Sequence, residues 1–196
     1  MKLLHLDSSA LGGHSVSRQL TADIVAQLKR QSPTLEVRYR DLAAQPLPHW
    51  APLADASDPA AILGNQVLEE FLAADTVVIG APMYNLSISS QLKAWIDRVV
   101  VAGQTFRYTA NGPEGLAGGK RVIVASSRGG SYQEGPYAAM DFQENYLRAV
   151  LGFIGISQVE IVRAEGLAVG DRQKTEALAS ARASIAALTP QRARAA

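Results

Sequence analysis

The sequence predicts an α/β protein in which a parallel β-sheet lies between two layers of helices. The first observation is that apolar, strand-like runs alternate with helical patterns five times along the chain. Such strict alternation is typical of parallel strands joined by right-handed crossovers. The second observation is that residues 76–80 and 121–125 are almost continuous apolar runs rich in β-branched side chains, as expected of strands covered on both faces.

The individual elements follow from hydrophobic periodicity, taken in chain order. Residues 2–7 form a short apolar run that ends at the loop 8–15, after which Ile24, Val25 and Leu28 recur at helical spacing. Several later helical patterns follow an Asp or Ser that can act as an N-cap. The further predicted strands are 35–39, which alternates like a strand near a sheet edge, 76–80, 121–125 and 159–162, and the further predicted helices are 60–73, 90–102, 137–151 and 171–188.

Two segments interrupt this alternation. The Pro-rich stretch 45–59 predicts a long surface loop, and the stretch 105–119, which contains Asn111-Gly112, predicts a hairpin excursion before the fourth strand of the sheet. The sequence contains no internal repeat and no linker. Residues 1–190 are therefore predicted to form one domain, followed by a short basic tail at 191–196.

Composition excludes several classes of function. The chain has no cysteine, which removes disulfides, thiolate metal sites and a Cys nucleophile, so redox chemistry would need a bound cofactor. Its formal net charge is +1, and this near balance argues against a nucleic-acid partner. The three histidines are scattered without the spacing of metal ligands, and we expect no metal site. No apolar run has the length of a signal-peptide core or a membrane span, which predicts a cytoplasmic protein.

A ligand of an open α/β sheet binds beyond the carboxyl ends of the strands. The loops after the first, third and fourth predicted strands are 8–17, 81–89 and 126–132, and all three are rich in Gly, Ser or aromatic residues. The first loop brings hydroxyl groups to the start of a helix, where unpaired amides and the helix dipole favour a phosphate. The alternative is that Ser15 or Ser17 is only the N-cap of that helix.

The second and third loops suit a flat heterocycle. Met83, Tyr84 and Asn85 offer sulfur and ring contacts for an aromatic system and an amide for its polar edge, although Met and Tyr after a buried strand also serve as core packing. In residues 127–130 the glycines let backbone amides approach a ring edge closely, or simply form a turn. The chain has neither a dinucleotide G-x-G-x-x-G fingerprint nor a P-loop.

The order and spacing of several motifs resemble those of a known family. The motifs are Ser8-Ser9 followed by SVS at 15–17, PMYN at 82–85 followed by QLKAWIDR at 91–98, TFRY at 105–108, SRGG at 127–130 and YLRAVLGFIG at 146–155. Together they resemble the FMN-dependent NAD(P)H azoreductases and quinone reductases of bacteria, which are relatives of flavodoxin. The resemblance covers nearly the whole chain.

This resemblance implies a flavodoxin-like three-layer sandwich with a five-stranded parallel sheet in the order 2-1-3-4-5 and one FMN per subunit. As a separate hypothesis, Tyr108 on the hairpin excursion covers the acceptor, although surface packing or a dimer contact would explain that residue at least as well. The implied FMN contacts are Ser9, Ser15, Val16 and Ser17 for the phosphate, Met83, Tyr84, Asn85 and Leu86 for the isoalloxazine, and Ser127, Arg128, Gly129 and Gly130 for its pyrimidine edge.

The chain departs from the family at Leu86, where Phe is usual, and at Ser89, where Pro is usual, so we expect a changed acceptor pocket. The implied activity passes electron pairs from NADH or NADPH through FMN to quinones and aromatic azo compounds in a ping-pong cycle. The family resemblance also implies a homodimer, for which the helix containing Trp95, Ile96 and Val99 would supply an apolar interface.

Two rival functions belong to other classes. A flavodoxin-type electron carrier would usually be strongly acidic so that it docks on its partners, whereas this chain is nearly neutral. A serine hydrolase would use Ser15, but the stretch 13–17 has Ser17 where a nucleophile elbow needs its second glycine. Both rivals are therefore less favoured than the flavoenzyme.

Overall fold

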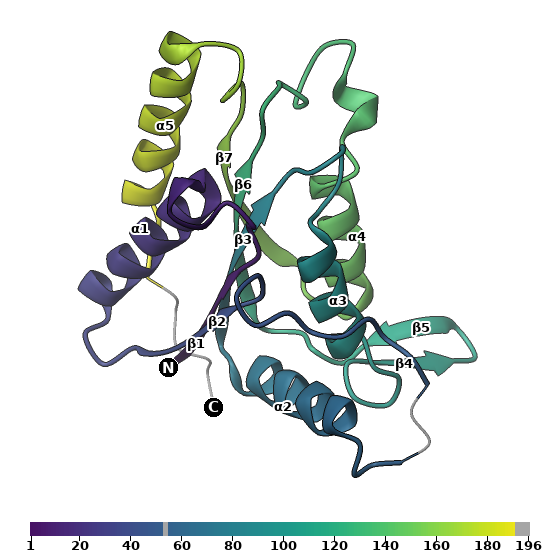
Figure 1. Cartoon of the computed structure of the whole chain (residues 1–196). Helices are drawn as coiled ribbons and strands as arrows, with labels where there is room; N and C mark the ends of the chain where they lie inside the picture. Colours follow the sequence, from purple (N-terminus) through teal and green to yellow (C-terminus); the bar gives the residue numbers. More distant parts are fainter. Residues whose placement is uncertain (53–54, 191–196) are drawn as a thin grey trace.

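The computed structural model describes residues 1–52 and 55–190, and the predicted basic tail lies outside the described residues. Five parallel strands form one sheet between two layers of helices (Figure 1). The strands are β1 (Lys2–Asp7), β2 (Glu36–Asp41), β3 (Thr76–Pro82), β6 (Arg121–Ser127) and β7 (Gln158–Ala164), in the order β2-β1-β3-β6-β7. Numbered within this sheet alone, that order is 2-1-3-4-5, which confirms the predicted fold.

Burial follows the position of each strand in the sheet. Every residue of β3 and β6 is buried, because these strands have a strand on each side and a helical layer on each face. The edge strand β2 is half-buried or exposed throughout, which confirms its predicted place near an edge. Successive residues of β3 enter opposite cores: Val77 and Ile79 belong to one cluster and Val78 to the other.

The two helical layers account for those two cores. Helices α1 (Val16–Gln31) and α5 (Asp171–Ala186) cover one face of the sheet, and α2 (Pro59–Ala73), α3 (Ser90–Val99) and α4 (Glu144–Phe153) cover the other (Figure 1). The hairpin of β4 (Phe106–Thr109) and β5 (Gly112–Gly115) is antiparallel, as predicted. No helix of the described residues is long and apolar enough to cross a membrane.

The predicted helix 137–151 was wrong at its start. Residues Ala138–Met140 form only a short 3-10 turn, and α4 begins at Glu144. The reason is Asp141, whose Oδ1 accepts the backbone N–H groups of Gln143 and Glu144 at 3.0 Å each. An Asp that bonds to the chain two and three residues ahead favours a new helix start over continuation of the preceding turn.

The interface residues expected on α3 are buried within this chain. Trp95, Ile96 and Val99 are 1%, 4% and 2% exposed and belong to its own core, where the Trp95 ring packs edge-on against Phe71 with centroids 5.6 Å apart. Periodicity shows that a helix face is apolar but not what covers it. The prediction that these three residues form a dimer interface was therefore wrong.

Candidate functional site

Three loops meet at the carboxyl edge of the sheet. They follow β1, β3 and β6, which are neighbours in the sheet. Ser8 Oγ donates to the carbonyl oxygen of Gly80 at 2.7 Å, which joins the first loop to β3. The N–H of Met83 donates to the carbonyl oxygen of Ser127 at 2.8 Å, which joins the second loop to β6. The second and third loops are thus hydrogen-bonded to each other, and the first loop is bonded to the strand that leads into the second.

The first loop ends in a cluster of hydroxyl groups at the start of α1. Ser15 is the N-cap, and its Oγ accepts the N–H of Arg18 at 3.3 Å and lies 3.0 Å from Ser17 Oγ. Two hydroxyls that share one hydrogen bond leave one O–H hydrogen free to bind an anion. The N–H groups of Val16 and Ser17 have no acceptor within the helix. Capping by Ser15 is therefore compatible with phosphate binding.

A tyrosine hydroxyl links the first loop to the second. Tyr84 Oη lies 3.0 Å from Ser9 Oγ and accepts the N–H of Ala10 at 3.2 Å. Ser9 Oγ also accepts the N–H of Leu11 at 3.2 Å. Here too, two hydroxyls share one bond and leave one donor hydrogen. Tyr84 was predicted only as a ring contact, so this polar link is one that sequence reasoning missed.

The second loop contains a strained tight turn. Tyr84 and Ser87 exchange two backbone hydrogen bonds of 2.9 and 3.1 Å, and between them Asn85 and Leu86 have φ angles of +48° and +72°. This left-handed region is costly for a branched side chain such as Leu, at about 1–2 kcal/mol, and such strain gathers at functional sites. The N–H of Phe142 donates to the carbonyl oxygen of Leu86 at 3.1 Å and holds the turn.

The two positions that depart from the family are accommodated differently. Leu86 adopts the strained conformation just described. Ser89 is the N-cap of α3, and its Oγ accepts the N–H of Leu92 at 3.2 Å. Ser89 therefore stabilises the start of the helix that follows the loop.

The third loop is held by a buried arginine. The side chain of Arg128 is fully buried and bonds to Asp141 at 2.9 Å and to Gln143 Oε1 at 3.0 Å. It also forms ion pairs with Glu144 and Glu165. Its backbone N–H donates to the carbonyl oxygen of Ala164 at 2.9 Å. Both parts of Arg128 are thus engaged inside the protein, whereas Gly129 is exposed and Gly130 half-buried.

Gln143 connects this arginine to the second loop. Its Oε1 accepts from both Ser126 Oγ and Arg128 Nε at 3.0 Å, and its Nε2 donates to the carbonyl oxygen of Ala81 at 2.8 Å. The side chain is completely buried. No sequence pattern marked Gln143, because an isolated Gln before a helix has no characteristic signature.

An ion-pair network supports the first loop. Arg18 makes a bidentate pair with Asp41 at 2.6 and 2.7 Å, and the bonds from Arg18 are the main reason that the pKa of Asp41 is lowered to about 2. Tyr39 donates to Asp7 at 3.1 Å. Burial, followed by the negative charge of Asp7, raises the pKa of Tyr39 to about 12. Sequence reasoning did not select Arg18 or Asp41.

Tyr108 lies away from the three loops. It is 76% exposed and stands on the hairpin, where its ring packs edge-on against Phe106. Figure 1 shows the hairpin beside the lower ends of α3 and α4, at the opposite end of the molecule from the loops. Within one chain the structure does not bring Tyr108 to the candidate site.

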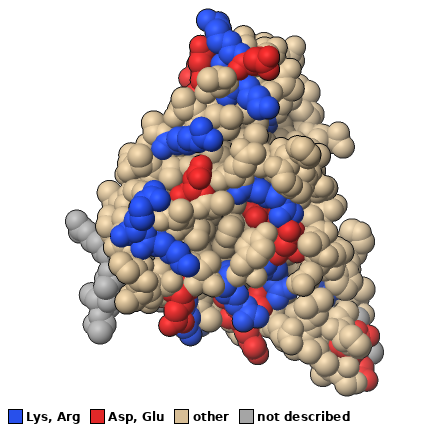
Figure 2. Space-filling view, turned by 60° about the vertical axis from the view of Figure 1, so that its left-hand side comes forward, with Lys and Arg blue, Asp and Glu red and all other residues tan. Residues whose placement is uncertain are grey.

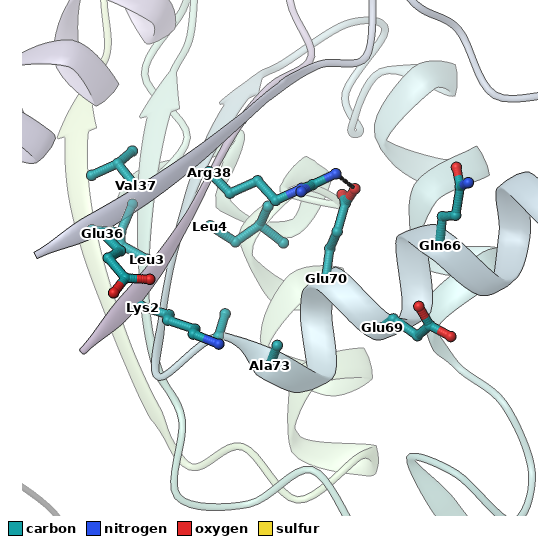
Figure 3. Close-up of a pocket in the computed structure, with 11 residues that line it drawn as sticks. Lys2, Leu3, Leu4, Glu36, Val37, Arg38, Gln66, Glu69, Glu70 and Ala73 are labelled. Atoms are coloured by element: carbon teal, nitrogen blue, oxygen red, sulfur yellow. Dashed lines mark ion pairs between the residues drawn. The ribbon is translucent and has the colours of Figure 1, made fainter.

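Two cavities differ in their relation to the site. One of about 560 Å³ lies between the beginnings of β1 and β2 and helix α2, far along the strands from the loops (Figure 3). There Glu70 is neutralised by Arg38 and Arg40. The other, also about 560 Å³, opens beside the Tyr84–Ser87 turn and is lined further by Ile88, Lys93 and Tyr146, among others. Only the second cavity can receive a molecule that reacts at the loops.

Neither the charges on the face drawn in Figure 2 nor the His, Asp and Glu side chains of the described residues define a further centre. Figure 2 shows positive and negative side chains interspersed over one face of the molecule. Among residues 1–52 and 55–190, no group of three His, Asp or Glu side chains is placed to hold a metal ion. The hydrogen-bond partners of Ser15 Oγ within the described part of the chain are Ser17 and Arg18, so the structure lends no support to a serine hydrolase.

Comparison with known proteins identifies the family. A family model described as flavodoxin-like fold matches residues 1–188. The chain is 59% identical to the FMN-dependent NADH:quinone oxidoreductase of Rhizobium meliloti (strain 1021), over 95% of this chain and 96% of that protein. The crystal structure of azoreductase from Bacillus anthracis str. Sterne is 30% identical, with a TM-score of 0.88, over 95% of this chain and 97% of that chain.

A further solved structure contains the cofactor that the sequence resemblance implied. It is an FMN-dependent NADH-azoreductase from Bacillus anthracis str. Ames Ancestor in complex with FMN, 27% identical with a TM-score of 0.86 over 94% of this chain and 95% of that chain. These findings confirm the resemblance on which the sequence prediction rested. Since the family match spans nearly the whole chain, this protein belongs to the family of proteins with the flavodoxin-like fold.

Proposed function

We propose that this protein is an FMN-dependent oxidoreductase that passes electron pairs from NADH to quinones and to aromatic azo compounds. One observation carries the proposal: three loops come together at the carboxyl ends of β1, β3 and β6. The first loop supplies hydroxyl donors, and the second contains the strained turn. The names of the relatives and of the solved neighbours support the same chemistry.

The residues fit an FMN molecule. The phosphate is bound by Ser9, Ser15 and Ser17 with the N–H of Val16, where donor hydrogens are free and the helix dipole is favourable. Met83 to Leu86 line the isoalloxazine, with the turn of Asn85 and Leu86 presenting backbone groups to the ring. Ser127, Gly129 and Gly130 contact the pyrimidine edge, and Arg128 holds their backbone in place from inside the protein.

The chain contributes binding and orientation rather than acid–base catalysis. When bound, FMN supplies two-electron redox chemistry. The cavity beside Tyr84 receives NADH and then, after NAD⁺ leaves, the acceptor, so that the two reactants follow each other at one place. One NADH and one proton convert a quinone to a hydroquinone, and two NADH and two protons convert an azo bond to two amines.

The proposal includes a homodimer and a cytoplasmic location. Because Trp95, Ile96 and Val99 are buried, an interface would use exposed aromatic side chains instead, such as Trp50, which is 59% exposed, and Tyr108. In such a dimer Tyr108 covers the acceptor in the site of a second copy, since it lies far from its own. The cytoplasmic location follows from the use of NADH, a coenzyme of the cell interior.

The electron-carrier alternative is less favoured. A carrier of this kind usually docks through a surface dominated by one charge, whereas this chain has a formal net charge of +1 and opposite charges are interspersed on the face drawn in Figure 2. A cavity beside the turn is also more useful to an enzyme that binds small acceptors than to a carrier.

An anaerobic absorbance titration tests the proposal. The purified protein is reconstituted with FMN, and NADH and then a benzoquinone are added. We expect the flavin band to bleach with NADH and to recover with the quinone. Absence of bound flavin would refute the proposed cofactor, and bound flavin that NADH cannot reduce would favour the carrier. A single species of monomer mass in light scattering at micromolar concentration would refute the dimer.

A further inference from the structure

Arg18 stands in the first turn of α1, next to the hydroxyl cluster, and it reaches back to the loop that precedes the helix. Its Nη2 and Nε donate to the carbonyl oxygen of Ser9 at 2.9 and 3.2 Å. We propose that Arg18, anchored by Asp41, is a positioning residue that holds the Ser9 loop in the shape required to bind the FMN phosphate. This inference rests on the proposed function.

The guanidinium of Arg18 has no donor left for a ligand. Of its five N–H groups, two bond to Ser9, two to Asp41 and one to the hydroxyl of Tyr39 at 3.3 Å. A cation beside an anion site would normally be assigned as a direct ligand of the anion. Because every donor of this cation is already engaged within the protein, Arg18 acts on the phosphate through Ser9.

Asp41 is itself fixed, so the pair forms a rigid anchor. Asp41 ends the edge strand β2, and its Oδ1 also accepts the N–H groups of Ala43 and Ala44 at 3.0 Å each. The next residue, Leu42, donates its N–H to the carbonyl oxygen of Asp7 at 2.8 Å, which binds the end of β2 to the end of β1. Arg18 thus connects the Ser9 loop to the end of the edge strand β2.

The consequence for ligand binding is specific to the phosphate. Ser9 Oγ lies within hydrogen-bond distance of Tyr84 Oη and accepts the N–H of Leu11. The orientation of the Ser9 peptide therefore determines where its hydroxyl and the following amides point. The isoalloxazine is expected at the second and third loops, which Gln143 and Arg128 hold through contacts that do not include Arg18. Loss of Arg18 should therefore weaken binding of FMN and leave binding of riboflavin, which has no phosphate, nearly unchanged.

The experiment compares the two flavins with the full-length protein stripped of cofactor. Dissociation constants of FMN and riboflavin are measured by quenching of flavin fluorescence for wild type, Arg18→Met, Arg18→Lys and Asp41→Asn. The matched control is Arg40→Met, because Arg40 lies on β2 beside Asp41, makes an equivalent bidentate pair with Glu70 at 2.8 and 2.7 Å and is similarly buried.

We expect Arg18→Met to raise the Kd of FMN by about 10-fold or more, the loss typical of hydrogen bonds from a charged group, and to change the Kd of riboflavin by less than about twofold. Arg18→Lys should lose less affinity for FMN, because the lysine ammonium can still bond to either Ser9 or Asp41. Asp41→Asn should shift binding in the same direction as Arg18→Met, and it carries the test if the Met variant does not fold.

Three results would overturn the inference while leaving the proposed function intact. The first is an FMN Kd that stays within about twofold of wild type in both Arg18→Met and Asp41→Asn, because the expected effect would then be absent. The second is an equal loss of affinity for FMN and riboflavin, and the third is the same loss of FMN affinity in Arg40→Met. Either of these two would show a general effect on the fold and not a specific effect on phosphate binding. A wild-type protein that binds neither flavin would overturn the proposed function first and this inference with it.

Discussion

Replacing Arg128 by Met should strongly destabilise the fold. The change removes a fully buried guanidinium that bonds to Asp141, Gln143 and Glu165. Glu144 keeps its bidentate partner Arg163, at 2.8 and 2.6 Å. Asp141, only 8% exposed, loses its cation and keeps only backbone N–H donors.

The loss in free energy of unfolding comes mainly from the carboxylate of Asp141, which stays buried without its cation. Breaking a buried ion pair by removing one partner costs about 3–5 kcal/mol, because the remaining charge stays buried without compensation. The flexible Met side chain fills part of the space left by the arginine, so the cost of a cavity is small by comparison. With a urea m-value of about 2 kcal/mol per molar, the unfolding midpoint should fall by about 1.5–2.5 M.

Equilibrium unfolding in urea, followed by tryptophan fluorescence, measures this change, because Trp95 is 1% exposed and reports on the core. The control is Arg107→Met, which removes a pair with Glu114 in which both side chains are about half exposed or more, and no measurable change is expected there. A loss below about 1 kcal/mol in Arg128→Met would show that the buried network does not stabilise the third loop and would refute this reasoning.

Three further predictions follow from single contacts. Because the pKa of Asp41 is depressed from 3.8 to about 2, its stabilising effect is present above pH 4 and is lost as pH falls toward 2; urea midpoints measured across this range should fall less steeply for Asp41→Asn than for wild type. Gly80→Ala would place a Cβ 2.8 Å from Asp7 Oδ1 and should cost about 1–3 kcal/mol in thermal unfolding, and an unchanged Tm would contradict the packing seen at the end of β3. Tyr84→Phe removes the bonds to Ser9 and Ala10 and should raise the Kd of FMN by about 3- to 10-fold; fluorescence titration that finds no change would exclude a role for this hydroxyl.

Much of the fold was predictable because its signals are local. The continuous apolar runs at 76–80 and 121–125 identified the two strands that are buried on both faces, and the alternation at 35–39 identified the edge. The loops that follow the strands could be assigned to one site from the sequence, since parallel strands place their carboxyl ends on one edge. The start of α4 was mispredicted because Asp141 accepts the backbone N–H groups of Gln143 and Glu144 in a competing local turn.

The sequence by itself determined the alternation of strands and helices, the serine and glycine loops and the resemblance to a family, because each of these depends on the order and spacing of residues. Tertiary structure alone decided what the side chains of Arg18, Arg128 and Trp95 contact. Asp41 lies 23 residues from Arg18 and Glu165 lies 37 residues from Arg128. No spacing rule connects such pairs, since chain folding in three dimensions brings them together and the low dielectric of the interior then makes their pairing necessary.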